Sequence, residues 1–337
     1  MQITTIGLDL AKHVFQVHGC DAAGNCGVKR RLRRNQVLEF FAGLAPCLVG
    51  IEACGTAHHW ARELRALGHD VRLMPAHYVK AYVKRGKNDA ADAAAICEAV
   101  SRPSMRFVPI KTREQQAVLT MHRTRDLLMR QRTQLINAVR GHLAEFGIVE
   151  PQGVWHLGRV LRHLEVDDEV IEPARQVIGL LASQLNDLEG RIKEVDKQIA
   201  LWHKASPTSQ RLATIPGIGP VIASAIAATV PDAGVFRSGR EFAAWLGLVP
   251  RQNSTGGKTR LGGISKRGNQ YLRRLLINGA SANLLRSKAT NADPWVIGLR
   301  RRRPSMVVAV ALANKTARIA WAVMQRKENY QRMAAAA

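Results

Sequence analysis

The chain of 337 residues is long enough for two or three domains, and its apolar content of 46% is typical of a globular protein. It carries 50 Lys and Arg against 26 Asp and Glu, a formal net charge of +24 with a pI near 10.8, which predicts a polyanionic partner and makes nucleic acid the default. Five cysteines without a Cys-x-x-Cys spacing argue against a disulfide framework and a thiolate zinc site, and they favour a reducing cytoplasm.

The first part of the chain alternates between strand and helix patterns. Strands are predicted at 3–10, 13–20, 28–34, 47–53 and 71–74, and helices at 35–44, 56–67 and 89–100. Three opening strands followed by alternating helices and strands indicate a mixed sheet with helices on its faces. We therefore predict a first domain of the α/β class at residues 1–108.

Four acids stand out in this domain because acids are scarce in the chain. Asp9 lies in the first strand and Glu52 in an apolar run, where an unpaired charge needs a cation. Asp89 and Asp92 open an alanine-rich helix on one face. Each acid alone is more simply explained as structural, through the helix dipole or through an ion pair such as Asp9 with Lys12. Together they form an oxygen-rich set suited to Mg²⁺ or Mn²⁺, ions that promote phosphodiester cleavage.

Residues 109–205 change to a long-helix pattern and form the predicted second, helical domain. Apolar residues recur at alternating spacings of three and four from Ile178 to Trp202, which is a heptad seam. An earlier helix is predicted at about 112–146, where Arg125 and Arg132 interrupt the seam. The two helices form either an antiparallel hairpin within the chain or a dimerising coiled coil, and the pattern does not choose between them.

The third predicted domain, 206–337, is mostly helical and opens on a Pro-Gly-Ile-Gly turn. Gly217 and Gly219 in this turn resemble the hairpin of helix-hairpin-helix modules, whose backbone N–H groups bind DNA; a plain helix start with Pro at its first position is the alternative. The uncharged run 212–231 is broken by proline and glycine in its first half, so it is too short to span a bilayer. No signal peptide is expected at the N-terminus either, and we predict no membrane partner. Helices are predicted at 221–230, 241–248, 270–285 and 305–324.

The segment 251–274 is the most distinctive part of this domain, with seven Lys or Arg, five Gly and no acid. Glycines let backbone N–H groups approach a phosphate, and the cations neutralise it. The hydroxyl of Ser254 within it is a phosphate ligand or a nucleophile, and on local grounds the ligand is favoured. Ser265 is predicted to be the N-cap of a helix beginning near Lys266. The predicted nucleic-acid contacts are Arg251, Gly256, Gly257, Lys258, Arg260, Lys266, Arg267, Arg273 and Arg274.

These motifs together resemble a known family. Gly-Leu-Asp9-Leu-Ala-Lys, Ile-Glu52-Ala-Cys-Gly and Lys-Asn-Asp89-Ala-Ala-Asp92-Ala resemble a RuvC-like DEDD domain of the ribonuclease-H-like fold. Joined to Pro-Arg-Gln-Asn-Ser254-Thr-Gly-Gly-Lys, they resemble the transposases of DEDD-type bacterial insertion sequences, which are related to Piv-type DNA invertases and to bridge-RNA-guided recombinases. The resemblance covers nearly the whole chain in the expected order.

The resemblance implies a site and partners. Asp9, Glu52, Asp89 and Asp92 would bind Mg²⁺, and Ser254 would attack DNA to form a phosphoserine link. The neighbouring position, often a second serine in the family, is Thr255 here. The family's partners are the DNA of element ends and target and a structured non-coding guide RNA, and a homodimer or homotetramer is expected. Residues 1–108 would be the catalytic domain, 109–205 the coiled coil and 206–337 the transposase domain with the serine.

Two other functions are consistent with the same residues. A metal-dependent endonuclease of Holliday-junction type would use water as nucleophile and Ser254 only as a ligand. A non-catalytic DNA- or RNA-binding protein would leave the four acids without a function, so it is the weakest of the three hypotheses. The leading prediction is a cytoplasmic, nucleoid-associated recombinase that excises and inserts an insertion sequence.

Overall fold

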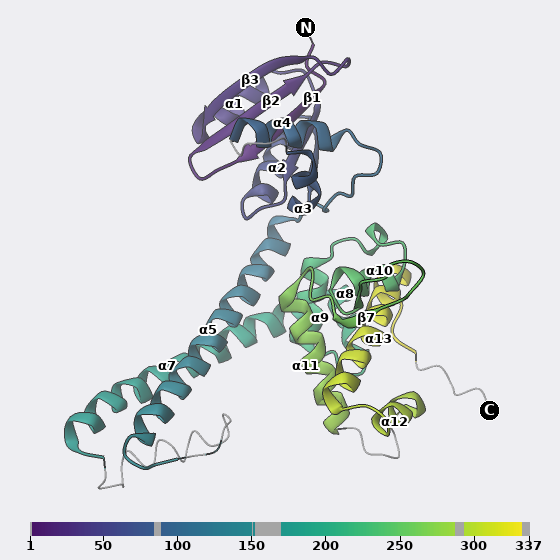
Figure 1. The fold of residues 1–337 in the computed structure, drawn as a ribbon. Coiled ribbons are helices and arrows are strands. Elements are labelled where there is room, and N and C mark those ends of the chain that lie inside the picture. Colours follow the sequence, from purple (N-terminus) through teal and green to yellow (C-terminus); the bar gives the residue numbers. More distant parts are fainter. Residues whose placement is uncertain (1, 84–88, 150, 152–169, 287–292, 332–337) are drawn as a thin grey trace. The chain divides into compact units, whose positions relative to one another are not determined.

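The computed structural model describes residues 2–83, 89–149, 151, 170–286 and 293–331. The chain forms two compact units, Met1–Arg113 and Glu114–Ala337 (Figure 1). The boundary lies close to the predicted end of the first domain at residue 108. The second predicted boundary, at 205, coincides with the end of a helix inside the second unit.

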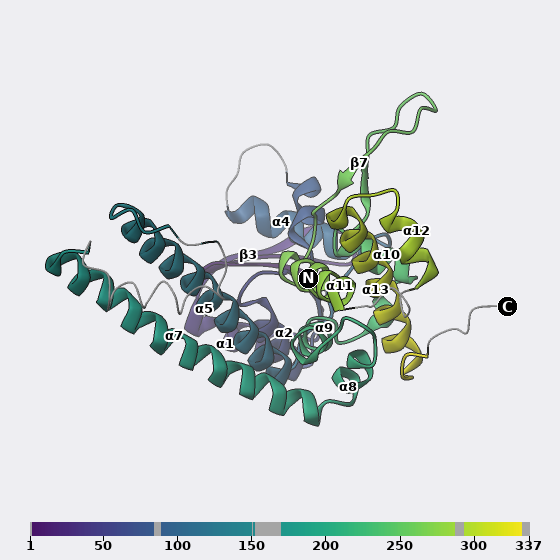
Figure 2. The same ribbon diagram turned by 90° about the horizontal axis from the view of Figure 1, so that it is seen from below.

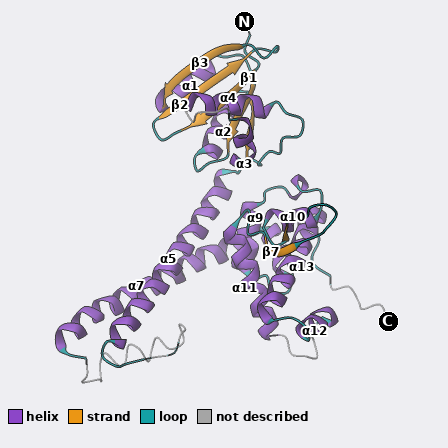
Figure 3. Cartoon of the chain, in the orientation of Figure 1, coloured by secondary structure: helices purple, strands orange, loops and turns teal. Residues whose placement is uncertain are grey.

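The first unit is built on a five-stranded mixed sheet in the order β3-β2-β1-β4-β5. Its strands are among the orange arrows in Figure 3, where β1, β2 and β3 are labelled. Strands β1, β2 and β3 are antiparallel neighbours, whereas β4 runs parallel to both β1 and β5. The mixed α/β sheet predicted from the sequence is therefore confirmed. The strands are β1 (Thr5–Leu10), β2 (Val14–Cys20), β3 (Cys26–Arg33), β4 (Leu48–Glu52) and β5 (Asp70–Met74).

One face of this sheet forms the main core of the unit. Alternation along β2 buries Phe15 and Val17 on that face, as a period of two requires. They pack with residues of helices α1 (Val37–Ala42) and α2 (Ala57–Ala66), including Phe41. A short helix α3 (Ala76–Val79) and two single 3₁₀ turns, η1 (Arg34–Gln36) and η2 (Lys80–Tyr82), complete the unit's minor elements.

The opposite face is covered by helix α4 (Asp89–Val100), which was predicted with the same bounds. Its close approach depends on glycines in the sheet. A Cβ at Gly7 would lie 2.1 Å from the carbonyl oxygen of Ala93 and 2.4 Å from the backbone nitrogen of Cys97, and a Cβ at Gly50 would lie 2.7 Å from the Cβ of Val100. The backbone of α4 therefore rests directly on β1, and this contact fixes where the helix begins relative to the sheet.

We expect Gly7→Ala to displace α4, because backbone atoms of the helix occupy the space that the added methyl group needs. The loss should be about 1–3 kcal/mol of unfolding free energy, the usual cost of overpacking. The control is Gly43→Ala, where the nearest atom is 3.6 Å away. Thermal unfolding checks the prediction, and equal midpoints for both variants would contradict it.

The second unit begins with a long antiparallel helical hairpin of α5 (Arg113–Ala144) and α7 (Glu172–Ala205). The two arginines that interrupt the seam pair across it: Arg125 Nε with Asp196 Oδ1 at 2.5 Å, and Arg132 Nη1 with Glu189 Oε1 at 3.0 Å. Residues of the seam are buried against α5 within the same chain. The hairpin interpretation is confirmed, while dimerisation stays a prediction. The stretches 150 and 152–169 of the predicted helical domain lie outside the described residues.

The remaining helices pack around one core. They are α8 (Pro207–Ala213), α9 (Pro220–Thr229), α10 (Gly239–Trp245), α11 (Gln270–Arg286), α12 (Pro294–Arg300) and α13 (Ser305–Arg326), with a 3₁₀ turn η4 (Ala233–Val235). By length and composition α13 could cross a membrane, but eight of its residues are buried, and seven of these, including Val308 and Ala313, belong to this core. That burial is typical of a core helix.

Candidate active site

Three of the four predicted acids meet in the first unit. Asp9 lies near the end of β1, and Asp89 and Asp92 lie in the first turn of α4. One ligand oxygen from each lies within 4.8 Å of those of the other two. The approach of α4 onto Gly7 explains the meeting, since Asp9 is the next residue of β1 on the same face.

Glu52 lies close to this group without belonging to it. The parallel register that pairs Leu8 with Ile51 places Asp9 and Glu52 one residue further along neighbouring strands. Glu52 is half-buried and engaged in an interaction of its own, yet its charge acts on Asp9. The register therefore brings the fourth acid to the same end of the strands, beside the other three.

The environment of Asp9 opposes its ionisation. Burial, and after it repulsion from Asp92, Asp89 and Glu52, together raise the pKa of Asp9 from 3.8 to about 6. A backbone hydrogen bond from Leu10 opposes the change only weakly. Several carboxylates in such proximity favour a bound cation, because a cation relieves the repulsion among them.

The donor set fits a hard divalent cation. All the contributing atoms are carboxylate oxygens, the ligands that Mg²⁺ and Mn²⁺ prefer, and among the described residues no thiol or imidazole joins the group. Asp9, Asp89 and Asp92 would hold the ion, with Glu52 beside them.

Ser254 belongs to the second unit, where it lies in a β-hairpin that the sequence patterns did not predict. The hairpin pairs β6 (Pro250–Gln252) with β7 (Leu261–Ile264). Its arms continue toward the tip through a 2.9 Å hydrogen bond from the Asn253 N–H to the Arg260 carbonyl oxygen. Ser254 Oγ accepts a hydrogen bond from the Arg260 backbone N–H at 3.3 Å. Ser254 is exposed. The hairpin of β6 and β7 extends from the helices of its unit (Figure 2).

The glycines at the hairpin tip have a conformational role. Gly256 and Gly257 have φ of 54° and 73°, and Thr255 and Lys258 pair across them. Two successive residues with positive φ are typical of a type I′ turn, which strongly prefers glycine. This turn explains the two glycines without a ligand, and it leaves Arg251, Lys258 and Arg260 exposed around Ser254.

Two expectations about the basic segment need correction. Ser265 is not a helix N-cap, since α11 begins at Gln270 and the Asn269 side chain accepts from the Leu272 N–H at 3.0 Å. Positive φ at Lys266 and at Gly268 breaks any helical path before that point.

Arg273 differs from the expected nucleic-acid contact because it is buried, at 8% exposure. Its Nη1 donates to the carbonyl oxygens of Leu246 and Arg267 at 2.9 and 2.8 Å. It therefore joins the basic segment to the core. Arg274 forms an ion pair with Asp126 and lies over the Tyr271 ring. Lys266 and Arg267 are exposed.

The predicted helix-hairpin-helix turn joins α8 to α9. Gly217 has a φ of 88°, and a Cβ there would lie 3.0 Å from the Gly279 carbonyl oxygen, so this glycine packs against α11. Gly219 is the N-cap of α9, and its α-carbon faces open space. Of the two, Gly219 is the one with room for a ligand.

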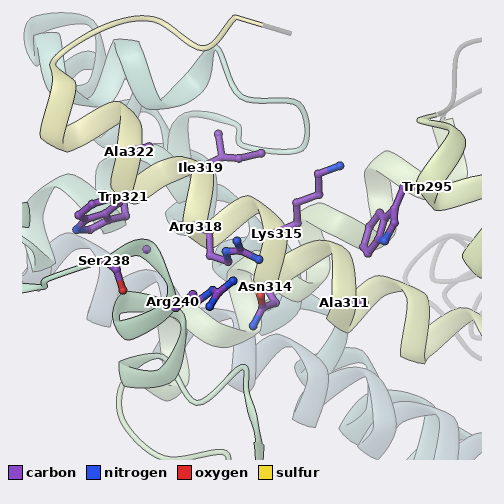
Figure 4. Close-up of a pocket in the computed structure, with 11 residues that line it drawn as sticks. Ser238, Arg240, Trp295, Ala311, Asn314, Lys315, Arg318, Ile319, Trp321 and Ala322 are labelled. Carbon is purple, nitrogen blue, oxygen red and sulfur yellow. The ribbon is translucent and has the colours of Figure 1, made fainter. Parts of the chain in front are cut away.

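Sequence patterns also missed a hollow of about 950 Å³ on α10, α12 and α13 (Figure 4). Arg240 and Arg318 line it together with Asn314, and neither guanidinium pairs with a described acid. Trp295 lies beside Lys315, whose Nζ is 4.9 Å from the ring centre. The cations and the aromatic rings of this hollow lie far apart in the sequence and form no local motif. The hollow is therefore visible only in the fold, where it extends the cationic surface of the second unit.

Comparisons with known proteins cover both units. Residues 6–148, which span the four acids, match the DEDD_Tnp_IS110 transposase family, and residues 209–294, which span Ser254, match the transposase IS116/IS110/IS902 family.

Whole-chain relatives carry the same description. A "Probable family 20 transposase" of Pseudomonas aeruginosa is 52% identical over 98% of this chain and 99% of its own length. The transposase for insertion sequence element IS1328 of Yersinia enterocolitica is 43% identical over 95% and 96%, and that for IS1111A of Coxiella burnetii is 40% identical over 98% and 92%. The chain therefore belongs to the IS116/IS110/IS902 family of transposases, DNA strand-transfer enzymes that transpose insertion sequences.

Proposed function

We propose that this transposase cuts and rejoins DNA through a phosphoserine intermediate formed by Ser254, with the carboxylates of the first unit as its metal-binding group. The observation that carries the proposal is the meeting of Asp9, Asp89 and Asp92. Acids held this close together repel one another, so they favour binding of a divalent cation. The bound cation can in turn bind the phosphate oxygens of a phosphodiester. The exposed serine between arginines supplies the nucleophile that such a site lacks.

The chemical step keeps the number of phosphate ester bonds unchanged. Ser254 Oγ attacks phosphorus, the Oγ–P bond forms, and the bond from phosphorus to one deoxyribose oxygen breaks. The serine proton passes to a base, and the released deoxyribose oxygen takes up a proton. In the second half, the hydroxyl of another strand attacks the phosphoserine and restores the serine. No external energy source is needed because one phosphate ester replaces another.

Two groups of residues have different roles in this reaction. Arg251, Lys258 and Arg260 are exposed around Ser254 and would neutralise the phosphate under attack. Asp9, Asp89 and Asp92 would hold Mg²⁺, or Mn²⁺, and a bound ion would supply Lewis-acid stabilisation of phosphate oxygens. The position of these acids at the end of β1 and the start of α4 is fixed by packing, so they need little rearrangement.

The partners beyond DNA are part of the proposal. A structured non-coding guide RNA would select the target by base pairing, while the protein binds backbone and shape. The net charge of +24 supports a second polyanion besides DNA. A homodimer or homotetramer would bring two DNA ends together.

The competing function is a metal-dependent endonuclease in which water attacks. One observation favours it: the carboxylate group lies entirely within the first unit and does not need Ser254. Trapping of protein–DNA complexes under denaturing conditions, followed by mass spectrometry, tests the choice. A DNA-linked peptide containing Ser254 supports the recombinase, and cleaved DNA without any adduct supports the endonuclease.

Metal binding should depend on pH through Asp9. Because its pKa is raised from 3.8 to about 6, the folded unit holds more protons than the unfolded chain between those values, and Asp9 lowers stability as pH rises through them. Mg²⁺ should therefore raise the unfolding midpoint at about pH 8, where Asp9 is ionised, and much less at about pH 5. Thermal unfolding with Mg²⁺ or with EDTA measures this, and an equal increase at both pH values would contradict it.

A further inference from the structure

The outer strand β3 carries a concentration of positive charge that neither the four acids nor the basic segment around Ser254 includes. Five of the six residues from 29 to 34 are Lys or Arg. Within β3, Val28 is half-buried and Leu32 is buried, and the other six residues are exposed. Long exposed edge strands often carry charges that prevent aggregation, which explains a few cations but not how they are arranged.

The register places three of these cations on the face of the sheet that carries Asp9. Asp9 pairs with Gln16 on β2, and Gln16 pairs with Arg31 on β3. Directly paired residues of antiparallel strands project to the same face. Arg31 thus lies in the same row as Asp9, two strands away.

The neighbouring rows extend the pattern. His18 pairs with Gly7 on one side and Lys29 on the other, and Val14 pairs with Arg33. Burial and the Lys29 charge both lower the pKa of His18, which agrees with that proximity. Lys29, Arg31 and Arg33 therefore form one cationic row on the face of Asp9, whereas Arg30 projects to the other face.

Nothing in the described part of the unit neutralises this cationic row. Strands β2 and β3 contain no acid, and none of the three side chains forms an ion pair or hydrogen bond with a described residue. Helix α4 packs on β1, β2 and β4, which leaves β3 exposed on this face. Alternate residues of a strand are about 6.6 Å apart, a spacing comparable with that of successive phosphates in an extended nucleic-acid strand.

We propose that Lys29, Arg31 and Arg33 bind the backbone of the DNA strand whose phosphate enters the carboxylate group at Asp9. This inference rests on the proposed function, because it takes the carboxylates to be the place where DNA is cut. DNA is the occupant that the position favours, since the cationic row leads across Gln16 to Asp9 on one continuous face. Exposed cations without partners at strand spacing bind phosphates and do not read bases.

The test compares neighbouring residues of equal charge on opposite faces of one strand. Arg31→Gln and the triple variant Lys29→Gln, Arg31→Gln, Arg33→Gln are compared with Arg30→Gln, all in a Ser254→Ala background. Binding of labelled DNA and RNA oligonucleotides is measured by fluorescence anisotropy in EDTA over a series of salt concentrations. The binding measurement depends on neither catalysis nor adduct formation. If the serine mechanism proves wrong, the measured DNA binding can therefore still be interpreted.

We expect the triple variant to reduce the slope of log affinity against log salt for DNA by about three and Arg31→Gln by about one, with Arg30→Gln unchanged. Arg31→Lys should restore the DNA slope, and unfolding midpoints should match across the variants. An equal loss in Arg30→Gln and Arg31→Gln would overturn the proposal, because it would show a general charge effect. A loss for RNA alone, or an unchanged slope in the triple variant, would also overturn it.

Discussion

Ser254→Ala should abolish the covalent protein–DNA adduct and reduce strand transfer by roughly 10⁴-fold or more, the scale of losing a nucleophile. Folding should be unaffected, because the only hydrogen bond to the Ser254 hydroxyl in the described structure comes from the Arg260 N–H on an exposed hairpin. DNA binding should persist, since the surrounding cations remain. Denaturing gels of reactions with labelled DNA measure the adduct directly.

Two matched hydroxyls serve as controls for Ser254. Thr255→Ala removes the adjacent hydroxyl at the hairpin tip, and Ser265→Ala removes a half-buried serine of the same segment. Both variants should retain the adduct. A normal adduct in Ser254→Ala would overturn the assignment of the nucleophile, and a loss confined to Thr255→Ala would move the assignment by one residue.

Asp9→Asn should have opposite effects on activity and stability. Metal-dependent strand cleavage should fall by at least about 100-fold, because the site loses a central ligand. The metal-free protein should instead unfold at a higher temperature above pH 6, since the pKa of Asp9 is raised to about 6 by burial and by three neighbouring acids. Replacing an unfavourable charge by an amide of the same shape relieves both costs.

The control for this variant is Asp70→Asn on β5. Asp70 is exposed, and among the described residues its side chain pairs with Arg72 alone, at 2.7 Å, an interaction that contributes little. Its replacement should leave cleavage and the unfolding midpoint nearly unchanged. Calorimetry with and without Mg²⁺ and a cleavage assay on the same preparations provide the comparison. A lower midpoint for metal-free Asp9→Asn would show that the acid has a structural partner instead.

Local patterns predicted those parts of the fold that depend on local physics. Helix α4 begins at Asp89 because acids favour a first turn, and the alanines that follow suit both a helix and close packing. The heptad seam from Ile178 to Trp202 predicted α7 since its period is that of a packed helix. The positions of the strands along the chain were predicted from local signals as well, such as the alternation of buried and exposed residues in β2, whereas their order in the sheet was not predicted.

The features that were not predicted from the sequence depend on contacts between residues far apart in the chain. Arg273 looks like a surface cation, but its partners include the carbonyl of Leu246, 27 positions earlier. The hairpin at Ser254 has no apolar alternation, because nearly all of it is exposed and glycines form its turn. The meeting of Asp9 with Asp89 and Asp92 could be proposed from their types, whereas the glycine contact that brings them together is visible only in the fold.

The two ion pairs across the long helical hairpin determine its alignment. Sliding α7 by one heptad would keep apolar residues on the seam, so the seam alone allows several alignments. In one such slip Arg125 would face Glu189 while Arg132 would face Ala182, and a largely buried guanidinium would lose its acid. The arginines that weaken the seam therefore select a single alignment, and they make the hairpin an arm of defined length.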